Sequence, residues 1–116
     1  ADWDRTKAFD VATNYISKYS DLKAIYCAND TMAMGAQEAV EKSGKKILVV
    51  GTDGNSDAIA SVQEGGLAAT VKQDSTAVGA KAVELLKELA SSTTKIDAAA
   101  DPKVVELPPV LIAKQG

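Results

Sequence analysis

Two stretches in the first half of the chain place apolar residues three or four positions apart, which is the spacing of one buried helix face. The first is 4–18, where Asp4 suits the N-cap position because its carboxylate can accept hydrogen bonds from free backbone N–H groups. The second is 31–43, with Asp30 expected as its N-cap and Gly44 as the glycine that ends it. Both are predicted to be amphipathic helices.

Two further helices are predicted in the second half. A short helix is expected to begin with Ser56 as its cap and to stop at the glycine pair 65–66. A long helix is expected from Ser75 to about Ala90. Its apolar face consists of Val78, Ala82, Leu85, Leu86 and Leu89. A helix with such a face needs an apolar surface to pack against.

Short apolar runs separate the helical stretches and are typical of strands. They occupy 23–28, 47–51 and 67–71. The run at 47–51 is continuous and rich in β-branched residues, which predicts a parallel strand buried on both faces. The residues expected to be deeply buried in the parallel sheet are Ile25, Val49, Val50 and Val71.

The pattern is weaker after the long helix. Residues 91–102 are small and polar, and we expect them to form a loop. An edge strand is predicted over 103–107 and is ended by Pro108 and Pro109, because proline cannot donate to the hydrogen-bond ladder of a sheet. One more short strand is predicted over 110–113.

The alternation of strands and helices predicts the fold class, which is α/β with a parallel sheet flanked by helices. In such sheets the ligand crevice lies beyond the carboxyl ends of the strands. Asn29, Asp53 and Gln73 each follow the last residues of a predicted strand. The fold is therefore expected to carry these three polar residues to one edge of the sheet.

Composition limits what this edge can do. The chain has 116 residues, a net charge of −3, no histidine and one cysteine. The negative charge argues against a nucleic-acid partner. The lack of histidine removes Ser-His and Cys-His nucleophilic pairs and imidazole metal ligands. Cys27 lies within an apolar run and is expected to be an inert core residue.

Motifs of phosphate-binding and dinucleotide-binding enzymes are missing from the sequence. No glycine-rich stretch ends in Lys and then Ser or Thr, and GTDGNSDA (51–58) has the wrong glycine spacing for a dinucleotide-binding turn. Asp53 could accept a phosphoryl group only beside an acidic metal-binding cluster and a lysine, neither of which the sequence places. We therefore expect a protein that is not an enzyme and that uses no cofactor or metal.

A neutral sugar suits the predicted edge. Carboxylates accept hydrogen bonds from pairs of hydroxyls, and amides offer a donor and an acceptor in one plane. Trp3 is the only tryptophan and could cover the apolar face of a sugar ring. Simpler interpretations are turn residues for Asn29 and Asp53, packing at the helix entry for Trp3, and helix core for Met32 and Met34.

Four segments resemble the carboxyl-terminal portion of periplasmic sugar-binding proteins of the ribose/allose/galactose class. They are ADWDRTKAFDVATN (1–14), AIYCANDTMAMGAQEAV (24–40), VVGTDGNSDAIASVQEGGLAATVKQD (49–74) and GAKAVELL (79–86). The resemblance extends over nearly everything to about residue 90. It implies part of a two-lobed, periplasmic-binding-protein-like type I fold, in which hinge strands join two α/β lobes that close on the ligand.

The resemblance also implies which residues contact the sugar. Trp3 stands where an aromatic ring stacks on the sugar ring. Asn29, Asp53 and Gln73 stand where sugar hydroxyls are bound. Thr52 stands where ribose binders often have a phenylalanine, which favours a hexose such as allose over ribose.

The family topology implies three parts. Residues 1–73 correspond to part of the carboxyl-terminal lobe, and 74–102 to a hinge crossing and a helix of the amino-terminal lobe. Residues 103–116 correspond to the return to the carboxyl-terminal lobe and a tail. No strand pattern precedes the first helix, so we expect the chain to be a fragment whose amino-terminal lobe is missing and could be supplied by a second chain.

For the complete protein, the resemblance implies the extracytoplasmic solute-binding component of an ABC sugar importer. Its partners would be a monosaccharide and the membrane subunits of the transporter. Its location would be periplasmic, or extracytoplasmic and lipid-anchored in a Gram-positive organism. The alternative is the effector-binding core of a LacI-type transcriptional repressor, which shares the fold. A third hypothesis is a half that is used as an isolated or complementing fragment.

Overall fold

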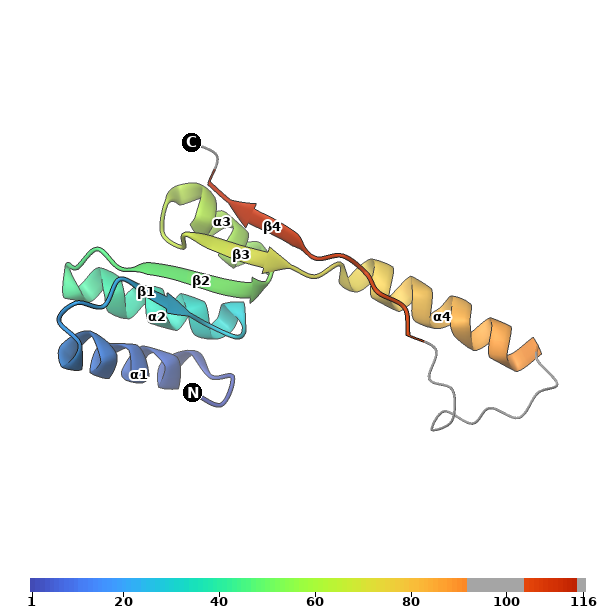
Figure 1. Cartoon of the computed structure of the whole chain (residues 1–116), viewed down its shortest axis with the longest axis horizontal. Helices are drawn as coiled ribbons and strands as arrows, with labels where there is room; N and C mark the ends of the chain where they lie inside the picture. Colours follow the sequence, from blue (N-terminus) through green and yellow to red (C-terminus); the bar gives the residue numbers. More distant parts are fainter. Residues whose placement is uncertain (92–103, 115–116) are drawn as a thin grey trace. The chain divides into compact units, whose positions relative to one another are not determined.

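The computed structural model describes residues 1–91 and 104–114, which Figure 1 colours along the chain. The chain divides into two compact units. The first unit consists of Ala1–Gln73 together with Val110–Gly116, and the second is Asp74–Pro109. All four predicted sugar-contacting residues lie in the first unit.

Helices and strands alternate along the first unit, as predicted. Its elements are α1 (Arg5–Lys18), β1 (Ala24–Tyr26), α2 (Asp30–Ser43), β2 (Leu48–Asp53), α3 (Ser56–Glu64), β3 (Ala69–Lys72) and β4 (Val110–Ala113). The second unit contains α4 (Ser75–Ser91). The α/β class and the sheet flanked by helices are confirmed.

The strands form one sheet in the order β1-β2-β3-β4. β1 pairs with β2 and β2 with β3 in parallel, so the expected parallel arrangement is confirmed for these three strands. β4 pairs with β3 in antiparallel fashion, with Val110 opposite Lys72. The sheet is therefore not wholly parallel, because the chain leaves β3 at its carboxyl end and re-enters the sheet at that same end.

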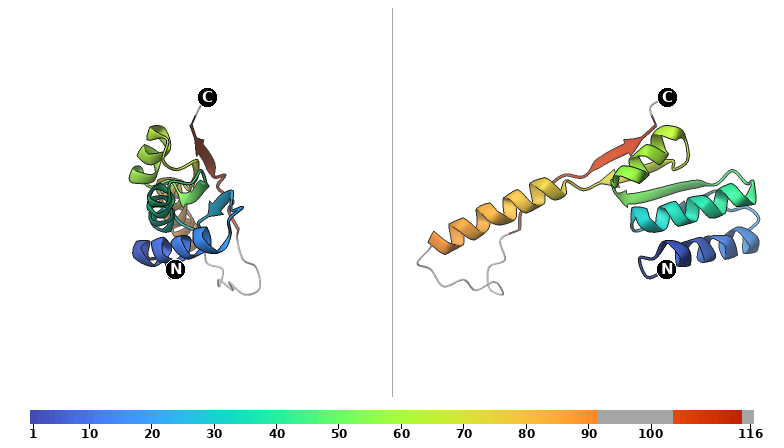
Figure 2. Two further views of the ribbon diagram at one scale, coloured as in Figure 1. Left: turned by 90° about the vertical axis from the view of Figure 1, so that its left-hand side faces the viewer. Right: turned by 180° about the vertical axis from the view of Figure 1, so that it is seen from behind.

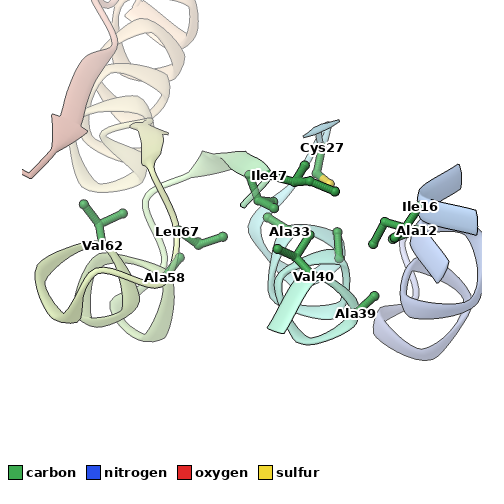
Figure 3. Close-up of a cluster of buried hydrophobic side chains, with 12 residues drawn as sticks. Ala12, Ile16, Cys27, Ala33, Ala39, Val40, Ile47, Ala58, Val62 and Leu67 are labelled. Atoms are coloured by element: carbon green, nitrogen blue, oxygen red, sulfur yellow. The ribbon is translucent and has the colours of Figure 1, made fainter. Parts of the chain in front are cut away.

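Helices α1, α2 and α3 lie on one side of the sheet, as the end-on view of Figure 2 shows. Small residues bring the helices close to each other and to the strands. Gly35 of α2 illustrates the point, because an added Cβ would overlap the backbone carbonyl of Arg5 at the start of α1. The buried cluster in Figure 3 joins all three helices to the sheet and includes Ala12, Ala33, Val49, Ala58 and Leu67.

The other side of the sheet carries apolar side chains that the described residues leave uncovered. Tyr26, Leu48 and Leu111 are 70%, 63% and 67% exposed. The strand register and the alternation of side chains place these three on one face, opposite the helices. The prediction of two buried faces for 47–51 is therefore wrong for the described residues.

Burial along the parallel strands follows the same asymmetry. Val49 faces the helices and is fully buried, as predicted. Val50 and Val71 lie on the open face and are only half-buried. Ile25 pairs with Val49 at the β1 edge of the sheet and is also half-buried, because no further described strand covers that edge.

Two local predictions are wrong. Asn55 rather than Ser56 is the N-cap of α3, and its side chain makes no capping hydrogen bond. Residues 104–107 of the predicted edge strand form no strand, because none of the described strands offers them a ladder partner. Lys103 and residues 92–102 of the predicted loop lie outside the described residues.

The apolar face predicted for α4 is present and remains accessible. None of the residues of α4 is buried, and Val78, Leu86 and Leu89 are among the exposed large apolar residues. Its surface also carries a hydrogen-bonded ion pair in which Lys81 contacts Glu84 at 2.8 Å, and this contact raises the pKa of Lys81. Val105 and Leu107 of the same unit line a pocket with Val78, Ala82 and Leu85, so they cover the apolar face only in part.

Candidate functional site

The carboxyl ends of three parallel strands define the candidate site. Asn29 precedes α2 just after β1, Asp53 is the last residue of β2, and Gln73 directly follows β3. Because these strands are parallel, their carboxyl ends share one edge of the sheet. Figure 1 shows the N-terminus on the same side of the first unit as the arrowheads of β1, β2 and β3.

Asp53 and Gln73 are joined by two hydrogen bonds. The side-chain Nε2 of Gln73 donates to Oδ1 of Asp53 at 3.3 Å, and the backbone N–H of Gln73 donates to the carbonyl of Asp53 at 3.0 Å. Asp53 is half-buried and Gln73 is exposed. The structure therefore places a carboxylate and an amide side by side, with Oδ2 of Asp53 and Oε1 of Gln73 left as acceptors.

The backbone of Asp53 is held in a conformation that L-residues rarely adopt. Its φ is 120°, and the following Gly54 has φ 77°. A Cβ at Gly54 would lie 2.5 Å from Cβ of Lys72 on the neighbouring strand, so glycine is required there by both conformation and space. A non-glycine residue at such a φ is a mark of functional sites, because the strain persists only where the surroundings enforce it.

Asn29 is the N-cap of α2. Its Oδ1 accepts a hydrogen bond from the backbone N–H of Met32 at 2.8 Å. No described residue accepts a hydrogen bond from its Nδ2 group, so this donor can face a ligand while the oxygen caps the helix. The expectation that Asp30 caps this helix is wrong, because the neighbouring asparagine occupies that position.

Asp30 instead lies in the first turn of α2 and is completely buried. Its Oδ2 accepts from the backbone N–H of Asn55 and its Oδ1 from the hydroxyl of Thr70, each at 2.7 Å. Sequence reasoning missed this role. The signal available was a second polar residue directly after Asn29, since one side chain is enough to cap a helix.

Trp3 lies just before α1 and is 66% exposed. It has φ 62°, and it precedes Asp4, whose side chain accepts from the backbone N–H of Lys7 and caps α1 as predicted. Trp3 is therefore not packed at the helix entry.

In contrast, Met32 and Met34 pack against the buried cluster, which confirms their assignment to the core.

Thr52 and Cys27 flank the strand ends. The hydroxyl of Thr52 lies 3.2 Å from that of Tyr26, and it donates to the carbonyl of Cys27 at 3.5 Å. Cys27 is buried as predicted, and this burial raises the pKa of its thiol. A thiol that stays protonated is a poor nucleophile and a poor metal ligand.

Neither a metal cluster nor a membrane span is found in residues 1–91 and 104–114. No group of three or more acidic or cysteine side chains is placed to hold a metal ion. No helix there is long and apolar enough to cross a membrane. The described chemistry at the strand ends is thus that of hydrogen-bonding carboxylate and amide groups.

Known proteins share this sequence and this arrangement. The periplasmic binding protein domain family matches residues 1–94. The D-allose-binding periplasmic protein of Escherichia coli (strain K12) is 47% identical over 110 residues, which are 91% of this chain and 35% of that protein. The ribose import binding protein RbsB of Bacillus subtilis (strain 168) is 45% identical over 89 residues, which are 77% of this chain and 29% of that protein.

Solved structures agree with the sequence relatives. An ABC transporter periplasmic solute binding protein from Actinobacillus succinogenes 130z, crystallised with bound D-allose, superimposes with a TM-score of 0.84 at 35% identity. The match covers 98% of this chain and 38% of that one, and across these three relatives this chain spans 29–38% of their length. The chain belongs to the periplasmic binding protein domain family, within which its named relatives are sugar-binding proteins.

Proposed function

We propose that this chain forms part of the binding site of a monosaccharide-binding protein, the extracytoplasmic component of an ABC sugar importer. Trp3 stacks on the sugar ring, and Asn29, Asp53 and Gln73 hydrogen-bond its hydroxyls. The named relatives support this proposal, since they are a D-allose-binding periplasmic protein, a ribose import binding protein and an ABC transporter solute binding protein with bound D-allose. None of those three is a repressor, so the LacI-type alternative gains no support from them.

The observation that carries the proposal is the pairing of Asp53 with Gln73 at the carboxyl edge of the sheet. The carboxylate can accept from a sugar hydroxyl through Oδ2, and the amide of Gln73 can accept from a second hydroxyl through Oε1. The nearby Asn29 offers a donor. Such a set of donors and acceptors matches sugar hydroxyls, which both donate and accept hydrogen bonds. Holding a sugar in this way makes and breaks no covalent bond, so we propose binding rather than catalysis.

Thr52 supports a hexose such as allose as the ligand. A threonine beside Asp53 occupies less space than the phenylalanine expected in ribose binders, so a larger ring can be accommodated. The hydroxyl of Thr52 is held by Tyr26 and by the carbonyl of Cys27, which fixes the orientation of the side chain. The identities of 47% and 45% to an allose and a ribose binder are too close to decide this point.

The complete protein is proposed to contain an amino-terminal lobe and to contact the membrane subunits of the transporter. Residues 74–102 would belong to that lobe, and 1–73 and 103–116 to the carboxyl-terminal lobe. The exposed apolar residues Tyr26 and Leu48 on the sheet, and Val78 and Leu86 on α4, support only the coarser point that the complete protein has further parts that cover them. We propose an extracytoplasmic location, with a lipid anchor if the organism is Gram-positive.

A ligand panel tests the proposed function. The complete protein is titrated by calorimetry with D-allose, D-galactose and D-ribose under one set of conditions. We expect saturable binding of one sugar per protein, with the tightest binding for a hexose. Ribose binding tighter than that of both hexoses would contradict the assigned sugar class, and absence of binding to any monosaccharide would contradict the function.

A further inference from the structure

Asp30 is a buried carboxylate that the proposed sugar contacts do not use. Its side chain is fully buried, and within the described residues no lysine or arginine forms an ion pair with it. Two donors replace a cationic partner, the backbone N–H of Asn55 and the hydroxyl of Thr70. A buried carboxylate with two short hydrogen bonds and no counter-ion is costly to keep, so its partners indicate what it does.

The two partners lie on segments that carry proposed sugar contacts. Asn55 follows Asp53 by two positions. Thr70 lies on β3 and precedes Gln73 by three positions. Asp30 itself follows Asn29 directly. One carboxylate therefore connects the three strand ends from which Asn29, Asp53 and Gln73 project, even though the hydrogen bonds span 25 and 40 positions of sequence.

The bond to Asn55 fixes the unusual turn at Asp53. That turn has positive φ at Asp53 and Gly54, and its next backbone N–H, that of Asn55, is the group held by Asp30. Strained backbone of this kind persists only where surrounding contacts enforce it. Asp30 supplies such a contact on one side of the turn, while the pairing of β2 with β3 supplies the other.

Strand β2 leaves room for the carboxylate of Asp30. Gly51 lies on the helix-facing side of β2, opposite Thr70. A Cβ added at Gly51 would overlap Oδ1 of Asp30 and would lie 3.0 Å from Cβ of Ala33. A glycine inside a strand is typical of such a close approach. The carboxylate of Asp30 therefore packs directly against the backbone of β2 at Gly51.

We infer that Asp30 is a positioning residue of the sugar site, which sets the relative placement of Asn29, Asp53 and Gln73 without touching the ligand. The inference rests on the proposed function for its effect on affinity. Its effect on the geometry of the strand ends does not depend on any ligand, and this difference allows the two proposals to be tested separately.

The first measurement uses the ligand-free complete protein. Amide hydrogen exchange is compared between the wild type, Asp30→Ala and Thr70→Val, with Val62→Ala as a control that destabilises the core without touching the network. We expect faster exchange at Asn55 and Gln73 in Asp30→Ala, beyond any change in Val62→Ala. Thr70→Val should affect Gln73 more than Asn55. Exchange at both positions equal to that of Val62→Ala would overturn the inference.

The second measurement is sugar affinity for the same proteins, with Asp30→Asn added. Asparagine can accept from the Asn55 N–H and donate to the Thr70 hydroxyl, so it should restore most of the affinity. We expect at least a tenfold loss in Asp30→Ala and little loss in Val62→Ala or in Asp10→Asn, which removes an exposed charge. A folded Asp30→Ala protein with wild-type affinity would overturn the inference; should Asp30→Ala not fold, an unchanged affinity in Thr70→Val would do so. A wild type that binds no sugar refutes the proposed function, and the exchange measurement then decides the positioning role.

Discussion

Gln73 donates its side-chain amide to the carboxylate of Asp53, across the ends of two adjacent parallel strands and 20 positions of sequence. The bond orients both groups at the edge where a ligand is expected. It uses one of the two N–H donors of the Gln73 amide and one oxygen of Asp53, and it leaves acceptors on both residues. These two side chains therefore present one surface for hydroxyl groups, and a change in either should alter what the other offers.

Relief of backbone strain at Asp53 should be measurable as stability. In the ligand-free protein we expect Asp53→Gly to have a free energy of unfolding higher than that of Asp53→Ala by about 1 kcal/mol. Strain at positive φ costs about 1–3 kcal/mol, and part of the gain is offset by the flexibility of glycine in the unfolded chain. Urea unfolding of both variants checks this. Equal stability would mean that φ 120° is not strained.

Gly54 should tolerate alanine much less well than Gly44. Both have positive φ, 77° and 67°, but an added Cβ meets Lys72 at Gly54 and nothing within 4 Å at Gly44. Gly44→Ala should cost about 1–2 kcal/mol for conformation alone, and Gly54→Ala should cost more because of the overlap. The midpoints of urea unfolding compare the two. Similar losses of stability in the two variants would show that the side chain of Lys72 moves aside freely.

Stability should depend on alkaline pH through Cys27. Burial raises the pKa of its thiol above the ordinary value, so at alkaline pH the folded state keeps a proton that the unfolded state loses. The contribution to stability is thus complete below pH 9 and falls as pH rises toward the folded-state pKa, by at most about 1.4 kcal/mol per pH unit. Unfolding of wild type and Cys27→Ala from pH 8 to 10 checks this. If the free energy of unfolding changes with pH in the same way for both proteins, the thiol is not held protonated by burial.

The 116-residue chain alone should bind sugar weakly or not at all. It supplies one wall of the proposed two-walled cleft, and one wall cannot exclude water from the hydrogen bonds. Calorimetry of the isolated chain, with and without an added amino-terminal lobe, checks this, and the added lobe should restore binding. Micromolar binding of a monosaccharide by the chain alone would count against the two-lobed account.

Periodicity was sufficient for the parallel core of the fold because helix faces and short apolar runs are local features of the sequence. Caps and turns also followed from local chemistry at Asp4 and Gly44, where one residue type is clearly preferred. The direction of β4 could not be predicted, because it depends on where the chain re-enters the sheet.

The roles of Asn29 and Asp30 could not be separated by sequence. Asparagine and aspartate are almost equally good N-caps, so the pair is ambiguous from local propensity. The decision comes from partners far along the chain, Asn55 and Thr70, which give Asp30 two donors in a buried position. The burial of the strand residues was overestimated for a related reason. The sequence of an apolar strand does not show which of its two faces the described helices cover.

The direct test of the account is sugar binding by the complete protein with and without the Asp53 carboxylate. D-allose is titrated into wild type and Asp53→Ala by calorimetry, and thermal melting of the ligand-free proteins is recorded as the control for folding. Loss of a charge-assisted hydrogen bond should weaken binding by about 1.5–3 kcal/mol, more than tenfold, while melting of the ligand-free protein stays nearly unchanged. If Asp53→Ala binds the sugar as tightly as the wild type does, Asp53 is only a turn residue and the proposed site is wrong.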